Sequence, residues 1–482
     1  MNHRPALRSI GAFAGCLVLL AGCGAGGSDS GVKTPLPREG SVRVVNALTD
    51  SGSMSSFLSS SIFAVNQYGD STDLRQVLVG QYVMNILLTP PDDLNVPLVA
   101  NEQLDLTDPD EVSFYLIGTT ATPQEVRIHN QDIAYQVNLN NPAAFPPPDY
   151  QILHAAMTSV AAVGGTVDVY VTDASTDITT VAPTATLSFG EHTDLARLDP
   201  AVTYRVQVTK SPLQNVLTDV LYDSGGFTLA RLQRSTFMLM DNYGSYGVAL
   251  RVANINATGA TSFANETLQG TMRVTNEMPD VPSIDVYLGD PEATTPPLAD
   301  PVATGVAFGA TTGYFDVPNG DFTVYVTAAG VRTTLAKRAV TLVGGQARGV
   351  YALGLATITT STAAVDAFVE SQRSITGQSQ VRFVDAAPSA GIIDVYLLVP
   401  GQNVGDVSPI VAGGALLVST PLALTPGSYD IAVTRTSTTV QLFGPERIVV
   451  ADGGVYSAVL VEAAGGGPPL TLQFTQETIP PP

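Results

Sequence analysis

The chain has 482 residues, of which 45% are hydrophobic and only 13% are charged, and its formal net charge is −21. This length predicts roughly three to five domains with cores of their own. The strong negative charge excludes nucleic acid and anionic lipid headgroups as direct electrostatic partners.

Residues 1–22 have the layout of a secretory signal. Two arginines precede an uncharged, mostly apolar run from Ile10 to Leu20, which is shorter than the roughly 20 residues of a membrane-spanning helix. The run ends in Leu20-Ala21-Gly22-Cys23, which resembles the bacterial lipobox. We therefore predict cleavage before Cys23 and its lipidation with acyl chains such as palmitate. An ordinary signal peptide with a chance cysteine is the alternative.

Cleavage removes two basic residues and no acidic one, so the mature chain carries a net charge of −23. Cys16 and Cys23 are the two cysteines of the sequence, so the folded modules hold no disulfide. Gly24 follows the lipidated position where an aspartate would mark inner-membrane retention, and we expect an outer-membrane location. The Gly-, Ser- and Pro-rich residues 23–40 are predicted to be a flexible tether.

A similar pair of strands recurs along the rest of the chain. Met272-Arg273-Val274-Thr275-Asn276 precedes Ile284-Asp285-Val286-Tyr287-Leu288, and Val381-Arg382-Phe383-Val384-Asp385 precedes Ile393-Asp394-Val395-Tyr396-Leu397. The Arg-to-Asp spacing is twelve residues in both copies. A second copy has Gln151 to Ala155 followed by Val167-Asp168-Val169-Tyr170. The first copy has Val42-Arg43-Val44-Val45-Asn46, but its serine-rich residues 51–61 depart from the pattern.

Two further landmarks support four copies. Turns such as Pro426-Gly427 precede alternating strands, here Tyr429-Asp430-Ile431-Ala432-Val433. An aromatic–glycine pair recurs as Tyr68-Gly69, Phe189-Gly190 and Phe308-Gly309. Units of about 110 residues with many short strands predict an all-β fold of tandem immunoglobulin-like sandwiches. The predicted modules span residues 41–139, 150–265, 271–369 and 380–478, with candidate joints at 141–149, 254–270 and 370–379.

These strands resemble the bacterial family called domain of unknown function 4397. The resemblance rests on the Val-Arg-Val-type, Asp-Val-Tyr and Pro-Gly-x-Tyr strands, covers most of residues 41–478 and is strongest in the third and fourth copies. It implies an extracytoplasmic β-sandwich repeat, often found on lipoproteins. The family has no established activity, so it supplies no functional residue.

The repeated aspartates and tyrosines alternate with core residues and share one face of their strand. One interpretation is an acidic–aromatic patch for a sugar or a cation. The other, which repetition favours, is a fold requirement in which the aspartate binds a neighbouring loop. The residues are Asp168, Asp285 and Asp394 with Tyr170, Tyr287 and Tyr396.

Other candidate groups are sparse. His154 takes the slot of Asn46, Asn276 and Asp385 and is expected to cap a strand end, and His129 and His192 have no partner at zinc-ligand spacing. The acidic cluster Asp105, Asp108, Asp110 and Glu111 does not match a calcium loop, so we expect a solvated turn with calcium as the alternative. Gly244-Ser245-Tyr246-Gly247 lacks the spacing of a nucleophile elbow.

The sequence therefore predicts no catalytic residue, no metal site and no cofactor, and one modified residue, Cys23. The leading hypothesis is a lipid-anchored envelope protein with non-enzymatic binding or scaffolding modules for an unknown protein or glycan ligand. The alternatives are an envelope adhesion or structural protein, and an enzyme accessory subunit or hydrolase.

Overall fold

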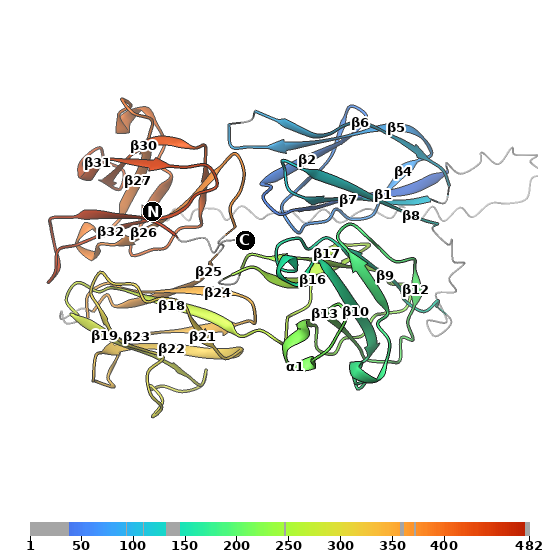
Figure 1. The fold of residues 1–482 in the computed structure, drawn as a ribbon. Helices are drawn as coiled ribbons and strands as arrows, with labels where there is room; N and C mark the ends of the chain where they lie inside the picture. Colours follow the sequence, from blue (N-terminus) through green and yellow to red (C-terminus); the bar gives the residue numbers. More distant parts are fainter. Residues whose placement is uncertain are drawn as a thin grey trace, which may run out of the picture. The chain divides into compact units, whose positions relative to one another are not determined.

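Almost all of the described chain consists of short strands joined by turns (Figure 1). The computed structural model describes residues 38–92, 94–108, 110–131, 145–244, 247–356, 361–370 and 373–477. The predicted signal peptide, Cys23, the predicted tether up to residue 37 and the Ser245-Tyr246 pair lie outside the described residues. From Arg38 onward the chain forms one compact unit.

The first module has eight strands in two sheets. They are β1 (Glu39–Leu48), β2 (Ser53–Leu58), β3 (Ser61–Asn66), β4 (Arg75–Leu78), β5 (Gly80–Thr89), β6 (Val96–Leu106), β7 (Asp110–Gly118) and β8 (Pro123–Gln131). One sheet has the order β4-β1-β7-β8 and the other β3-β2-β5-β6. The serine-rich stretch of the sequence therefore forms β2, in the place that the Asp-Val-Tyr strand takes in the other copies.

The second module repeats this order and adds one strand. Its elements are β9 (Asp149–His154), β10 (Thr166–Asp173), β11 (Ala185–Ser188), β12 (Ala196–Arg197), β13 (Tyr204–Lys210), α1 (Val216–Asp219), β14 (Val220–Asp223), β15 (Arg234–Asn242), β16 (Ala249–Asn256) and β17 (Gly259–Ser262). The sheets are β12-β9-β15-β16-β17 and β11-β10-β13-β14. Because β16 and β17 form a hairpin, the joint predicted to begin at residue 254 begins only after Ser262.

The third and fourth modules have eight strands each. The third has β18 (Gly270–Glu277), β19 (Ser283–Gly289), β20 (Ala303–Ala307), β21 (Phe315–Val317), β22 (Gly320–Ala328), β23 (Thr334–Leu342), β24 (Ala347–Leu353) and β25 (Ala364–Glu370). The fourth has β26 (Ser379–Ala386), β27 (Ile393–Leu398), β28 (Val411–Gly414), β29 (Leu422–Leu424), β30 (Gly427–Arg435), β31 (Gln441–Val450), β32 (Val455–Val461) and β33 (Thr471–Gln476). Single 3-10 turns span Ala161–Val163, Ile178–Thr180, Pro388–Ala390 and Val404–Asp406.

All four modules share one topology, which confirms the prediction of tandem all-β sandwiches of the immunoglobulin-like class. In each, the fourth, first, seventh and eighth strands form the first sheet, and the third, second, fifth and sixth form the second. The first and seventh strands run parallel, as β1 and β7 do, while the other pairs in these sheets are antiparallel. Within the described ranges, no helix has the length and apolar content to cross a bilayer.

Each module buries a core between its two sheets. On β1, Val42 and Val44 point inward with no exposed surface and join a cluster that includes Met84 and Phe114. The other modules have equivalent clusters, which include Phe237, Val324 and Phe383. Alternation along each strand places every second side chain in this core.

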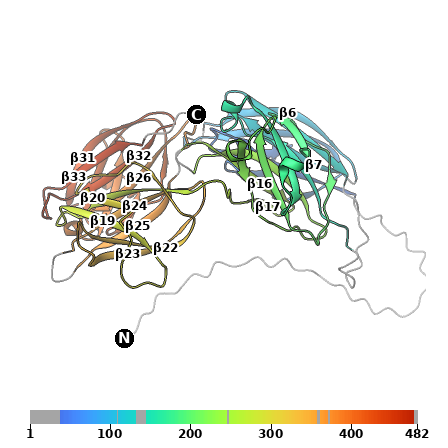
Figure 2. The same ribbon diagram turned by 60° about the horizontal axis from the view of Figure 1, so that its bottom comes forward.

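The opposite faces of the first sheets are also buried, because the modules pack in pairs. Val45 and Tyr115 of module 1 share an apolar cluster with Leu153 and Met238 of module 2. Tyr351 of module 3 shares another with residues of β26 and β32 in module 4. Figure 2 shows β24, β25, β26 and β32 side by side. In each pair, the sheet that contains the first and seventh strands packs on its counterpart.

Candidate functional site

The repeated aspartate joins two separate parts of its own module. Asp285 on β19 accepts hydrogen bonds from the Thr304 hydroxyl at 3.0 Å, from Gly305 N–H in β20 at 2.8 Å and from Gly330 N–H after β22 at 2.8 Å. Its burial opposes ionisation, but the N–H donors of Gly330 and Gly305 outweigh that effect and lower the pKa of the carboxyl. The side chain therefore fixes an edge strand to a turn.

Similar bonds recur in modules 2 and 4. Asp394 accepts from Thr436 at 2.5 Å, Gly413 at 2.8 Å and Ser437 at 2.9 Å, and the Thr436 hydroxyl contributes most to lowering its pKa. Asp168 accepts from Thr186 at 2.6 Å and from Ser211 at 2.8 Å. The fold requirement is the correct interpretation for these aspartates.

The strand-end polar residues also have a shared structural role. Asn46, Asn276 and Asp385 each accept a hydrogen bond from the N–H two residues later, at 3.0–3.2 Å. The backbone carbonyls of Asn46, Asn276 and His154 face the recurring glycine turn. Gly69, Gly190 and Gly309 donate to Asn46, His154 and Asn276 at 2.7–2.8 Å.

His154 is fully buried, and its Nε2 lies 3.2 Å from the carbonyl of Gly165. Desolvation lowers the pKa of the imidazole, which favours its neutral form. His129 and His192 are exposed on two different modules. Within the described residues, no three His, Cys, Asp or Glu side chains converge as metal ligands would.

The acidic cluster of module 1 divides between a turn and an interface. Asp110 accepts from the N–H of Thr107 at 2.9 Å and from its hydroxyl at 2.6 Å, which closes the turn before β7. Glu111 instead points toward module 2 and is 5% exposed. The sequence grouped these residues because they are neighbours, but alternation sends successive side chains to opposite faces.

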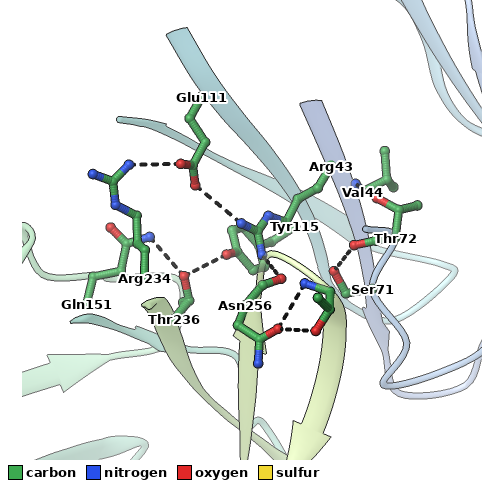
Figure 3. A network of polar contacts seen from close by, with 11 residues as sticks. Arg43, Val44, Ser71, Thr72, Glu111, Tyr115, Gln151, Arg234, Thr236 and Asn256 are labelled. Carbon is green, nitrogen blue, oxygen red and sulfur yellow. Dashed lines mark hydrogen bonds and ion pairs between the residues drawn. The ribbon is translucent and has the colours of Figure 1, made fainter. Parts of the chain in front are cut away.

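Glu111 is the centre of a polar network between modules 1 and 2 (Figure 3). Its two oxygens lie 3.3 Å from Nη2 of Arg43 and 2.8 Å from Nη1 of Arg234 on β15. Arg43 also donates to the carbonyl of Asn256 at 2.8 Å. The Tyr115 hydroxyl donates to the Thr236 hydroxyl at 2.9 Å, and burial raises the pKa of Tyr115. One carboxylate thus holds an arginine from each module.

A corresponding network joins modules 3 and 4. Arg273, at the position of Arg43 in the repeat, donates to Glu370 at 2.7 and 3.0 Å and to Glu477 after β33 at 2.6 Å. Burial opposes the charge of Arg273, but its bond to Glu477 and the charge of Glu370 raise its pKa above the ordinary value. The Tyr314 hydroxyl donates to Glu370.

A third contact joins the two pairs of modules. Arg373, in the joint before module 4, donates to the carbonyls of Thr49 at 3.2 Å and Ser51 at 2.5 Å. Its guanidinium lies 4.8 Å from the ring centre of Tyr68, and Arg251 of module 2 lies 5.4 Å from the same ring. Burial lowers the pKa of Arg373 and raises that of Tyr68. The aromatic residue of the first aromatic–glycine pair is therefore an inter-module contact.

These groups are charged and buried, yet each is bound to another group of the same chain. These ion pairs and hydrogen bonds therefore stabilise the contacts between modules. The sequence alone does not predict this role. Arg43, Arg273 and Arg382 were visible as a repeated landmark, but each lies at an outward position of a strand whose outward neighbours, such as Val45, are apolar. A strand with apolar residues on both faces is buried on both.

One family model matches part of the chain. Residues 270–396, which comprise module 3 and the first strands of module 4, match the family model described as domain of unknown function (DUF4397). A search of curated proteins gives no match.

Three solved structures align at low similarity. The Bacillus anthracis TIE protein is 10% identical with a TM-score of 0.15, over 90% of this chain and 76% of that one. Alpha-glucan-recognising family 41 carbohydrate-binding modules from streptococcal virulence factors are 12% identical with a TM-score of 0.14, over 45% and 95%. A streptococcal ancillary pilin is 10% identical with a TM-score of 0.15, over 63% and 95%. The family match over residues 270–396 agrees with the resemblance that the third and fourth copies show in the sequence.

Proposed function

We propose that this chain is a lipid-anchored protein of the bacterial outer membrane whose docked β-sandwich modules form a non-enzymatic binding or scaffolding surface. The proposed lipid anchor and location rest on the lipobox that ends at Cys23. The role of the modules rests on one observation: the buried polar groups that recur along the chain bind its own loops or a neighbouring module. Arg43, Glu111, Arg273 and Glu477 are all used in this way.

Docked modules present a binding surface differently from modules that are joined by flexible linkers. Two buried sheet interfaces and the Arg373 contact restrict the modules, so loops at their ends stay at fixed separations. A partner that contacts several loops would lose less conformational freedom on binding than with freely jointed modules. The ligand that we propose for this surface is another envelope protein or a glycan.

Anchoring is tested by metabolic labelling with palmitate. The full chain should incorporate label and fractionate with membranes, and Cys23→Ala should abolish both. Cys16→Ala is the matched control, because this cysteine lies in the cleaved segment and should leave labelling intact. Equal labelling of the Cys23→Ala variant would reject the anchor.

The non-enzymatic role needs its own measurement. The chain is incubated with polysaccharide, ester and peptide substrates, and we expect no turnover above that of a heat-denatured sample. Turnover at about 1 s⁻¹ or faster, which is typical of enzymes, would reject the proposal.

A further inference from the structure

The outer face of the second sheet is covered in modules 2, 3 and 4. In modules 3 and 4 the covering segment is the connection between the second and third strands, which spans residues 290–302 and 399–410. In module 3, Tyr287 and Tyr325 beneath it are 3% and 0% exposed. Arg332 donates to the carbonyls of Leu298 at 3.0 Å and Ala299 at 3.2 Å, which holds the segment in place.

The same face is buried in the other two modules. Tyr170 of module 2 is 3% exposed. In module 4, Tyr396 and Leu398 form a cluster with Val404 and Val407 of the covering segment. A covered outer face is therefore the normal state of this sheet in the chain.

Module 1 lacks the cover. Its β2 and β3 are joined by residues 59 and 60 alone. By strand register, Ser55 takes the position of Asp285 and Phe57 that of Tyr287. Ser55 pairs with Leu87 as Asp285 pairs with Thr327, and both partners lie seven residues after the glycine that begins the fifth strand. On this face Ile62 is 63% and Val65 is 58% exposed, and Phe57 and Leu87 are half-buried.

The polar groups of this open face are already satisfied. The hydroxyls of Ser55 and Thr89 lie 3.0 Å apart, and Asn85 Oδ1 accepts from Asn101 N–H at 2.8 Å. The face therefore offers few side-chain donors for an extended peptide, in contrast to the Arg332 side of module 3. Modules 1 and 2 already pack on each other through sheet faces that carry aliphatic and aromatic side chains.

We propose that the open face of module 1, formed by Phe57, Ile62, Val65 and Leu87, docks against the same face of a second copy of this chain. Two identical faces can pack on each other about a two-fold axis, and the dimer is then closed because neither copy of the face remains free. Four strands about 4.8 Å apart and about six residues long give a face of roughly 400 Å². Burial of about 800 Å² in total is small, so the contact is weak in free solution. Anchoring of both copies in one membrane, which rests on the proposed function, would raise their effective concentration.

The test uses soluble residues 24–482, which contain the compact unit and no cysteine. Val65→Cys should form a disulfide-linked dimer under mild oxidation. Val331→Cys, 48% exposed on module 3, is the matched control and should stay monomeric. Because neither variant carries a lipid, the result does not depend on anchoring.

Sedimentation equilibrium then measures the association without a cross-link. Ile62→Asp should weaken it at least about tenfold, since each copy would bury an unpaired carboxylate. The melting temperature of this variant verifies its fold. Equal cross-linking of the two cysteine variants, or association unchanged in Ile62→Asp, would overturn the dimer. A monomer that binds an envelope fraction through Ile62 would overturn it as well.

Discussion

Arg273 and Glu477 are separated by 204 positions in the sequence, yet their side chains meet at 2.6 Å between modules 3 and 4. Glu370 binds the same guanidinium from the module 3 side. The side chains of the two glutamates are 4% and 14% exposed. The interface thus contains charges that are satisfied only while the modules are docked.

Arg273→Met should strongly destabilise the chain. The variant leaves two buried carboxylates without their cation, and loss of one partner of a buried ion pair costs about 3–5 kcal/mol. Urea unfolding, followed by circular dichroism, should show the loss as a lower midpoint for modules 3 and 4. Arg447→Met is the control, because Arg447 pairs with Asp430 but is 55% exposed, and we expect little change. Equal shifts in both variants would show that the Arg273 contact is not special.

Asp285→Ala should destabilise module 3 by about 1–3 kcal/mol, because it removes a buried carboxylate that accepts hydrogen bonds from the N–H groups of Gly305 and Gly330. Asp290→Ala is the comparison in the same module, since the exposed Asp290 accepts one bond from Glu292 N–H at 2.9 Å. Its effect on the unfolding midpoint should be smaller. An Asp285→Ala protein as stable as the unmodified chain would return the repeated aspartate to the list of ligand-binding candidates.

The strands were predictable because their signal is local. Five residues are enough to show the alternation of Val42 and Val44 with Arg43. Pro426-Gly427 is enough to indicate the turn before Tyr429. β2 was not predictable as the counterpart of β19, because Ser55 replaces the aspartate and Phe57 replaces the tyrosine. Only its pairing with β5 identifies its place.

The module contacts depend on residues far apart in the sequence, which no local pattern joins. Glu111 was assigned to an acidic turn because of Asp108 and Asp110, although its partner Arg234 is 123 positions away. The apolar outward residues of β1, Val45 and Ala47, were a usable sign that this strand is buried on both faces. They indicate burial but do not identify the sheet that covers them.

Glu277 should make stability depend on pH. Its side chain is 1% exposed at a position that is alanine in the other copies, as in Ala386, and burial raises its pKa from 4.5 to about 7. Between these values the unfolded chain releases a proton that the folded chain keeps. The stability contribution of Glu277 is therefore greatest below pH 4.5 and is lost as the pH rises toward 7, by about 3 kcal/mol in total.

Urea midpoints at pH 5 and pH 8 measure this loss, and Glu277→Gln should reduce it because the amide does not titrate. Asp385, whose pKa burial raises to about 6, contributes a smaller dependence of the same sign, and His154, whose pKa burial lowers, contributes one of opposite sign. If the unmodified chain and the Glu277→Gln variant lose equal stability between these pH values, Glu277 is ionised in the folded protein.

Gly69→Ala tests the junction around Tyr68. Gly69 has φ +82°, and an added Cβ would collide with the guanidinium of Arg251, which lies over the Tyr68 ring. Gly164→Ala is the matched control, because Gly164 has φ +88° with no atom within 4 Å of the added carbon. The control should cost about 1 kcal/mol from left-handed backbone strain alone. Gly69→Ala should cost more.

The excess in Gly69→Ala should vanish in an Arg251→Ala background, since the colliding group is then absent. Unfolding free energies of the two single variants and the double variant form the cycle. The cation–π contact of Arg251 is lost in both arms that lack the arginine, so the cycle isolates the collision. Additive effects would mean that Arg251 moves aside at no cost, and that its position over Tyr68 does not help to fasten module 1 to module 2.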